Sequence, residues 1–209
     1  MPKVAPIVPI TFAVIHDDVP AEVTLDFSSN ADVMSFTRWR IPNVTDEGLC
    51  CRGADAKEFA QLAAKRWRHY RDTDTAAMSL AELRQMIKDD PHGEYCFHLK
   101  ITADWFPASL GGAMARRTWC NHLMIDFLFA HPQICSRVVN VKMIGLNLLR
   151  AVCLIAKALD CKRVWGEATH DSAAFYQYHL GAPIEDMFIL EKPVIHQFAV
   201  NLAAVQRQP

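Results

Sequence analysis

Residues 122–169 form one continuous pattern of strand, loop, helix and strand. HLMIDFLFA (122–130) is nearly all apolar, as expected for a strand covered on both faces, and Pro132 ends it because proline cannot donate to a sheet. Residues 144–159 carry an apolar stripe at helical spacing, and CKRVWGEAT (161–169) predicts a second strand. Strands joined through a helix are typically parallel neighbours, so the pattern predicts an α/β protein.

The rest of the chain predicts further strands and helices of the same domain. Strands are predicted at 11–16, 21–27, 94–102, 109–117 and, as an antiparallel pair, within 187–202, and helices at 55–70 and 79–89. Ser79 with Glu82, and Asp55 with Glu58, have the spacing of a capping box at the starts of these helices. Residues 1–50 are interpreted as an elaboration of a single domain that comprises residues 1–209.

The segment that follows the second strand predicts one more helix. Asp171 is expected to cap a helix that starts at Ser172, and Gly181 is expected to end it in the left-handed conformation. Phe175 and Tyr176 are adjacent, so they cannot share one helix face. If Phe175 packs inward, Tyr176 points toward an edge.

Composition and charge exclude several classes of protein. The 22 Lys and Arg and 23 Asp and Glu give a formal net charge of -1, which favours neither nucleic acid nor an anionic membrane. No apolar run reaches the roughly 18 residues that a membrane-spanning helix needs. The N-terminus lacks a small-residue cleavage site and the seven cysteines lack a C-x-x-C pair, which predicts reduced thiols and a cytoplasmic location.

The strand, helix, strand and closing helix resemble the GNAT superfamily of acetyl-CoA-dependent N-acetyltransferases. IDFLFAHP (125–132) resembles the central strand of that family, IGLNLLRAVCLIAKALDCKRVWGEAT (144–169) its cofactor helix and following strand, and DSAAFYQYHLGA (171–182) its closing helix. The resemblance implies an α/β (α+β) fold with a mixed central sheet flanked by helices. It also implies acetyl-CoA as co-substrate and an amine-bearing small molecule or protein as acceptor, and it leaves a homodimer open.

The phosphate-binding signature of the family corresponds here to residues 140–147. A helix N-terminus offers free N–H groups and the positive end of its dipole, which suits the pyrophosphate of acetyl-CoA. Gly145 matches the signature, whereas Asn140 and Met143 stand where the family has Gln or Arg and the first Gly. By resemblance, the cofactor-binding residues are Phe129, Ala130, Lys142, Met143, Ile144, Gly145, Leu146, Asn147 and Ser172.

The resemblance also implies how the acetyl group is transferred. An exposed backbone N–H near Phe129 and Ala130 would polarise the thioester carbonyl while the amine attacks directly in a ternary complex. Tyr176 is the candidate general acid for the leaving thiolate, since the ordinary pKa of a tyrosine, about 10, is close to that of an alkyl thiol.

The acceptor amine must also lose a proton, which calls for a general base. Asp126 is the candidate, because it lies four residues before Ala130 and nominally on the same strand face, unless a bulge changes the parity. Glu167 and His122 are alternatives. A Ser-His-Asp hydrolase is not favoured by the run 170–172, because adjacency in sequence does not make a triad.

Two other functions remain open. The departures at Asn140 and Met143 favour a catalytically weak or inactive GNAT-like module that binds CoA or a protein partner. Arg and Trp residues also cluster in TRWR (37–40), KRWRHYR (65–71) and RRTW (116–119), a composition suited to phosphate and base contacts. The second cluster spreads over all faces of a helix, so nucleic-acid binding is the less favoured reading.

Overall fold

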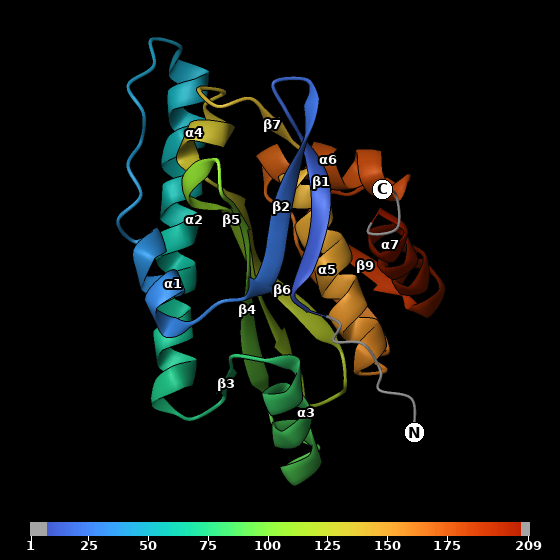
Figure 1. The fold of residues 1–209 in the computed structure, drawn as a ribbon. Helices are drawn as coiled ribbons and strands as arrows, with labels where there is room; N and C mark the ends of the chain where they lie inside the picture. Colours follow the sequence, from blue (N-terminus) through green and yellow to red (C-terminus); the bar gives the residue numbers. More distant parts are fainter. Residues whose placement is uncertain (1–7, 206–209) are drawn as a thin grey trace.

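The chain builds one mixed β-sheet with helices on both of its faces, as a computed structural model shows (Figure 1). The structure describes residues 8–205, except for the side chains of Asp171 and of residues 201–205, so both ends of the predicted 1–209 domain lie outside the described residues. Within this part of the chain the sheet has nine strands; eight lie in the order β7-β1-β2-β4-β5-β6-β8-β9, and the ninth, β3, pairs with β4.

The bounds of the elements agree with most of the predicted segments. The strands are β1 (Ile10–His16), β2 (Val19–Phe27), β3 (Ala76–Ala77), β4 (Tyr95–Ala103), β5 (Phe106–Arg117), β6 (Leu123–Ala130), β7 (Val141–Lys142), β8 (Arg163–Glu167) and β9 (Met187–Glu191). The helices are α1 (Asn30–Phe36), α2 (Glu47–Asp72), α3 (Leu80–Asp89), α4 (Pro132–Cys135), α5 (Ile144–Ala158), α6 (His170–Leu180) and α7 (Lys192–Val205). The pair β6–β8 is parallel, as predicted.

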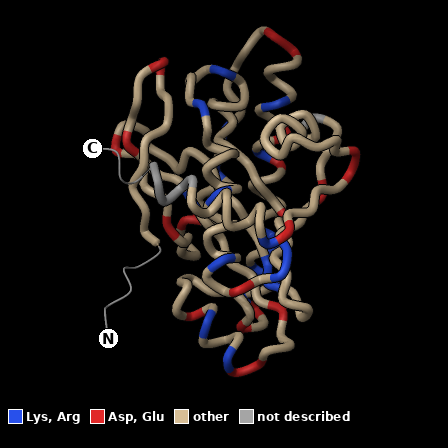
Figure 2. Tube along the Cα trace, turned by 90° about the vertical axis from the view of Figure 1, so that its right-hand side faces the viewer, with Lys and Arg blue, Asp and Glu red and all other residues tan. Residues whose placement is uncertain are grey.

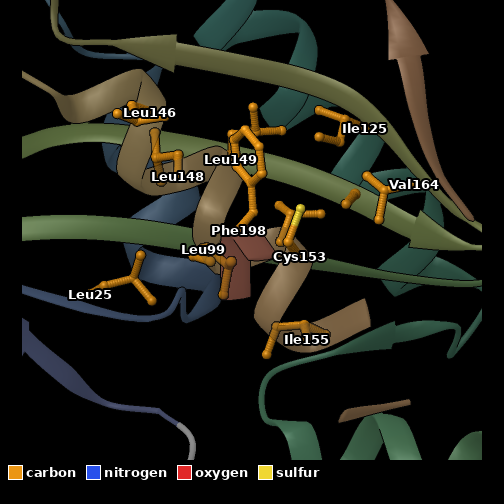
Figure 3. Packing of buried hydrophobic residues seen from close by; sticks show 14 of the residues in the cluster. Leu25, Leu99, Ile125, Leu146, Leu148, Leu149, Cys153, Ile155, Val164 and Phe198 are labelled. Carbon is orange, nitrogen blue, oxygen red and sulfur yellow. The ribbon is translucent and has the colours of Figure 1, made fainter. Parts of the chain in front are cut away.

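Helix α5 forms the centre of the larger hydrophobic core. Its predicted stripe is buried: Leu148, Leu149 and Val152 are fully enclosed between the sheet and α7 (Figure 3). Burying one such side chain contributes about 1.5–3 kcal/mol. On the α7 side, Phe198 reaches into the same cluster.

A second core lies on the opposite face of the sheet, beneath α1 and α2 (Figure 1). The buried alanines of α2 let the helix approach the sheet closely, and Trp67 fills the space beside them. Phe36 and Trp39 pack edge-on against Phe129 of β6, with ring centroids 5.7 Å apart in both pairs. This core fixes the position of α2 over β5 and β6.

The start of α2 differs from the prediction, and α1 was not predicted. Asp46 rather than Asp55 caps α2, since its carboxylate accepts from the N–H of Leu49 at 2.8 Å, and Asp55 lies inside the helix. Ser29 and Asp32 form a full capping box at α1. Asp46 and Ser29 are N-cap residues of the same kind as Ser79, which was predicted correctly as the N-cap of α3.

The second strand of the predicted hairpin within 187–202 is wrong, because α7 occupies that stretch. Ile195, Phe198 and Ala199 have helical spacing and are buried against the core next to α5. Pro193 lies in the first turn of the helix, where a missing N–H costs no hydrogen bond. Among the described helices, none combines the length and the apolar character needed to cross a bilayer.

Candidate functional site

Strand β6 pairs with β8 only along the amino-terminal part of β6. Their pairing runs from Leu123 opposite Val164 to Ile125 opposite Gly166. Strand β6 continues to Ala130, and in the described part of the chain no later residue of it pairs with β8. We call this place, after Ile125 and Gly166, the splay.

A β-bulge in β6 accompanies the splay. Ile125 lies opposite Ala115 of β5 and Phe127 lies opposite Met114, so Asp126 is the extra residue of β6. A bulge bends its strand and increases the local twist. It therefore turns the carboxyl half of β6 away from β8 at the same position where pairing with β8 ends.

The bulge also decides which backbone N–H groups face the splay. The N–H of His131 donates to the carbonyl of Leu110 in β5 at 2.8 Å. Because N–H directions alternate along a strand, the N–H of Phe129 also points to β5, whereas those of Leu128 and Ala130 point to the splay. Of the two predicted positions, Ala130 directs its N–H to the splay and Phe129 does not, while the N–H of Leu128, which was not predicted, also points there.

The N-terminus of α5 offers free N–H groups close to the splay. The first helical hydrogen bond runs from the N–H of Asn147 to the carbonyl of Met143 at 3.0 Å, which leaves the N–H groups of Ile144, Gly145 and Leu146 outside the helical pattern. Met143 adopts the left-handed conformation with φ of 75°, where a glycine is favoured. The substitution that departs from the family signature thus carries backbone strain.

Two predicted cofactor-binding residues, Asn147 and Lys142, also contact other groups of the protein. The side chain of Asn147 is buried, and its Oδ1 accepts from Arg150 at 3.1 Å, while its Nδ2 has no partner among the described groups. The backbone N–H of Asn147 donates to the carbonyl of Met143 and is not free for a ligand. Lys142 lies in β7, which pairs with β1, and its Nζ is 2.5 Å from Asp18. Both partners of that ion pair are exposed, so the pair contributes little and Lys142 stays accessible to an anion.

Helix α6 begins two residues earlier than predicted. Thr169, not Asp171, is the cap, because its side chain accepts from the N–H of Ser172. The Ser172 hydroxyl is in turn 2.9 Å from the N–H of Thr169, so this predicted cofactor-binding side chain takes part in a capping box. Gly181 ends the helix in the left-handed conformation, as predicted.

The paired aromatics of α6 lie across the splay, with burial opposite to the expectation. The ring of Phe175 is half-buried and lies 3.3 Å from the position that a Cβ on Gly145 would take, and Leu128 of β6 lies 3.5 Å from that position. Tyr176 is the buried one of the pair, 5% exposed, and stacks on Phe188 of β9. Burial raises the pKa of the Tyr176 hydroxyl to about 12.

Asp126 does not share a face with Ala130, and the predicted parity is wrong because of the bulge. Its carboxylate points to the α2 face, where Oδ1 is 2.6 Å from Arg66 and 3.2 Å from Nε of Arg116. The side chain is fully buried, and Oδ2 has no hydrogen-bond partner within the described structure. Burial raises the pKa of the Asp126 carboxyl, and the two guanidinium groups oppose that shift.

Asp126 belongs to a network of charges on the α2 face. Arg116 also contacts Glu94 at 2.9 Å, and Glu94 accepts a hydrogen bond from the Tyr70 hydroxyl. Burial and the bond to Glu94 raise the pKa of Tyr70 to about 12. The sequence showed Arg66 and Arg116 only as members of Arg/Trp clusters, because the contacts join α2, β5, β6 and the residue before β4, which are far apart in the chain.

The two alternative bases lie at opposite ends of β6 and β8. Glu167 follows Gly166 directly and borders the splay, where it lines a shallow hollow of about 320 Å³. His122 precedes β6, so the paired part of the strands separates it from the splay. Burial and the nearby Arg163 lower the pKa of His122, but its position excludes the predicted role at the splay.

A buried histidine that sequence reasoning did not select lies behind the site. His98 of β4 is completely enclosed, its Nδ1 is 2.8 Å from the Ser28 hydroxyl, and its Nε2 has no partner among the described groups. Burial lowers the pKa of His98 to about 3. No group of three metal-binding side chains occurs in the described residues.

The tryptophans of the Arg/Trp clusters differ in exposure. Trp39 and Trp67 are buried in the core beneath α2, which removes them from stacking on bases, while Trp119 is exposed. Figure 2 shows basic and acidic positions interspersed along the trace. The formal net charge of -1 gives no overall bias toward nucleic acid.

Comparisons with known proteins find similarity in structure only, since no family model and no curated protein matches this chain. Apo FdhC, a nucleotide-linked sugar GNAT, is similar over 95% of this chain and 99% of its own, at 9% identity and a TM-score of 0.53. A putative GNAT-family acetyltransferase from Desulfovibrio desulfuricans is similar over 81% and 99% of the two chains, at 11% identity and a TM-score of 0.46. Nourseothricin acetyltransferase is similar over 43% of this chain and 49% of its own, at 14% identity and a TM-score of 0.34. The likeness to FdhC confirms the predicted fold class, a mixed sheet flanked by helices.

Proposed function

From the GNAT fold of this chain, we propose that it transfers an acetyl group from acetyl-CoA to an amine by direct attack in a ternary complex. The observation that carries the proposal is the splay of β6 and β8 next to the free N-terminus of α5. Parted parallel strands expose backbone N–H groups that a closed sheet would use, and a helix N-terminus attracts phosphate. The exposed N–H groups of the splay suit the thioester end of acetyl-CoA, and the N-terminus of α5 suits its pyrophosphate.

The residues around the splay fit acetyl-CoA in their donor chemistry. The N–H groups of Ile144, Gly145 and Leu146 would hold the pyrophosphate, and Lys142 would add a positive charge beside them. Gly145 has no side chain to cover these donors. Bound acetyl-CoA would supply the acetyl group as a thioester, and the N–H of Ala130, which points to the splay, would polarise its carbonyl oxygen.

Tyr176 is proposed as the proton donor to the departing sulfur. In the overall transfer a C–N bond forms, the C–S bond breaks, the amine loses one proton and the sulfur gains one. A hydroxyl whose pKa is raised to about 12 keeps its proton at neutral pH, so it is available as a hydrogen-bond and proton donor. Its ring is held over Phe188 at the side of the splay.

The proton acceptor for the amine is proposed from the two carboxylates next to the splay. Asp126 stays a candidate through its Oδ2, which has no hydrogen-bond partner in the described structure, while its Oδ1 is held by Arg66 and Arg116. Glu167 lies at the end of β8 and is exposed, so it meets water and a substrate directly. A base acts best within hydrogen-bond reach of the proton that it removes.

A second function, a GNAT-like module that binds CoA or a protein without catalysis, is favoured by one contact. The ring of Phe175 lies against Gly145 and Leu128 and covers the path between the α5 N-terminus and the splay. An active enzyme requires this ring to turn aside when acetyl-CoA binds. A module that binds another ligand does not require this movement of the Phe175 ring.

Titration calorimetry with acetyl-CoA, followed by a thiol-release assay on a panel of amines, tests the proposal. We expect saturable binding and amine-dependent thiol release. Binding without thiol release on any amine would support the non-catalytic module. The absence of both would remove the acetyltransferase proposal. Gly145→Val serves as a matched variant for the calorimetry, because its Cβ would lie 3.3 Å from Phe175 and close to the free N–H groups.

A further inference from the structure

Arg66 is held in one position at the edge of the splay. Its Nη1 lies 2.6 Å from Oδ1 of Asp126, the bulged residue next to the last pair of β6 and β8. The guanidinium also lies over the ring of Phe127, 5.5 Å from the ring centroid. A charge-assisted hydrogen bond and a cation–π contact together fix a side chain that would otherwise sample many rotamers.

The surface that this pair presents to a ligand is cationic. The carboxylate of Asp126 is fully buried, whereas 43% of the Arg66 side chain is exposed. A guanidinium has five N–H donors, and one short contact to Asp126 leaves the others for a partner. Arg116, the second guanidinium in contact with Asp126, is less exposed and also pairs with Glu94, so Arg66 is the member that meets solvent.

The position of Arg66 matches the side from which an acceptor would arrive. Helices α5 and α6 lie on the other face of the sheet, where the free N–H groups would hold the cofactor. An amine that attacks a thioester in the splay would therefore approach from the α2 face of the sheet. Arg66, on α2 and in contact with the bulge, borders that approach.

We infer that Arg66 binds a carboxylate on the acceptor, so that the substrates are amines that also carry an acidic group. A guanidinium fork pairs with a carboxylate through two parallel hydrogen bonds and orients it, which would place the amine toward the splay. Asp126 and Phe127 then act as positioning residues for Arg66. This inference rests on the proposed acetyl transfer and specifies its substrate class.

Matched pairs of amines test the inference in the full-length protein. The first pair is 4-aminobutyrate and butylamine, and the second is O-phosphoethanolamine and ethanolamine, which tells carboxylate recognition from recognition of any anion. The measured quantity is the ratio of kcat/KM for the acidic amine to that for its neutral partner. Arg66→Gln is compared with Arg66→Lys, which keeps the charge beside Asp126, and with Arg68→Gln on the exposed side of α2.

The wild-type protein is expected to favour 4-aminobutyrate, and Arg66→Gln to lower that ratio about 10- to 100-fold, mainly through KM. Arg66→Lys should give an intermediate ratio, because it keeps the charge and loses the fork, and Arg68→Gln should leave the ratio unchanged. Acetyl-CoA affinity and thermal unfolding are measured for each variant, so that a folding defect is recognised.

Three results would overturn the inference. One is a wild-type protein that releases thiol equally with acidic and neutral amines, which leaves acetyl transfer intact and removes the role of Arg66. Another is an unchanged ratio in a folded Arg66→Gln variant. A preference for O-phosphoethanolamine alone would replace the carboxylate by a phosphate. If no amine supports thiol release, the proposed function fails first, and the substrate class fails with it.

Discussion

The ring of Tyr176 stacks on the ring of Phe188, with centroids 4.1 Å apart and planes inclined by 24°. Phe188 in turn lies 3.0 Å from the position that a Cβ on Gly166 would take, so this stack rests beside the last residue of β8 that pairs with β6. The aromatic ring of Tyr176 is therefore held by packing, independently of its hydroxyl.

Replacement of Tyr176 by Phe should lower turnover while leaving acetyl-CoA affinity and stability nearly unchanged. The stack on Phe188 survives the change, and only the proton donor is lost, which typically costs about 10²- to 10⁴-fold in rate. Steady-state kinetics measures the turnover, calorimetry the acetyl-CoA affinity and thermal unfolding the stability. Tyr178→Phe, two residues along α6 and exposed, is the control. Equal turnover in Tyr176→Phe would remove this residue from the mechanism.

Replacement of Met143 by Gly should stabilise the protein. A non-glycine residue pays about 1–2 kcal/mol for the left-handed conformation, and the extra chain entropy of glycine offsets about half of that. A gain of about 1 kcal/mol raises Tm by about 2–4 °C in a chain of this size. Thermal unfolding measures it, and Gly181→Ala, at a second left-handed position, should shift Tm downward.

The same Met143→Gly variant should bind acetyl-CoA more tightly, because it removes a side chain that is 39% exposed beside the free N–H groups of α5. Calorimetry on the two proteins checks this expectation. An unchanged affinity with a raised Tm would show that the pyrophosphate does not use this loop.

Replacement of Asp126 by Asn should destabilise the fold more than it alters the proton transfer. The change leaves Arg66 and Arg116 without the carboxylate that they share, and breaking such a pair costs about 2–3 kcal/mol when one partner is partly exposed. Urea unfolding gives the free energy, and Glu167→Gln is the comparison for the base. Normal stability combined with a large loss of kcat in Asp126→Asn would instead assign the base role to Asp126.

Acidification should destabilise the protein through His98. The pKa of His98 is lowered from 6.5 to about 3 in the folded state, so between these values the unfolded chain binds a proton that the folded chain does not. Its contribution therefore falls as the pH drops below about 6.5, by about 1.4 kcal/mol per pH unit. The slope of unfolding free energy between pH 6.5 and 4.5 should be smaller in His98→Gln. His92→Gln, an exposed control, should keep the full slope; equal slopes in all three would contradict the assignment.

The positions that the predicted site residues take in the fold agree with the sequence expectation only in part, for identifiable reasons. Gly145 and Met143 were placed at the start of α5, and the apolar stripe of that helix was confirmed. The backbone N–H of Ala130 points to the splay and that of Phe129 does not, because a single extra residue in β6 determines where the N–H groups point. The expected burial of Phe175 and Tyr176 was reversed, since which of two neighbours is covered depends on Phe188 of a separate strand.

Features that depend on near neighbours in the chain followed from the amino-acid pattern: the buried strand β6, the stripe of α5, the left-handed end of α6 at Gly181 and the parallel pair that a strand–helix–strand unit implies. Periodicity and capping act within one or two helical turns, so they can be read locally. Tertiary structure alone decided the bulge at Asp126, its contact with Arg66 60 residues away, and the helical form of α7. Each of these depends on which surfaces meet after the chain has closed, because burial and pairing energies join residues that no local pattern connects.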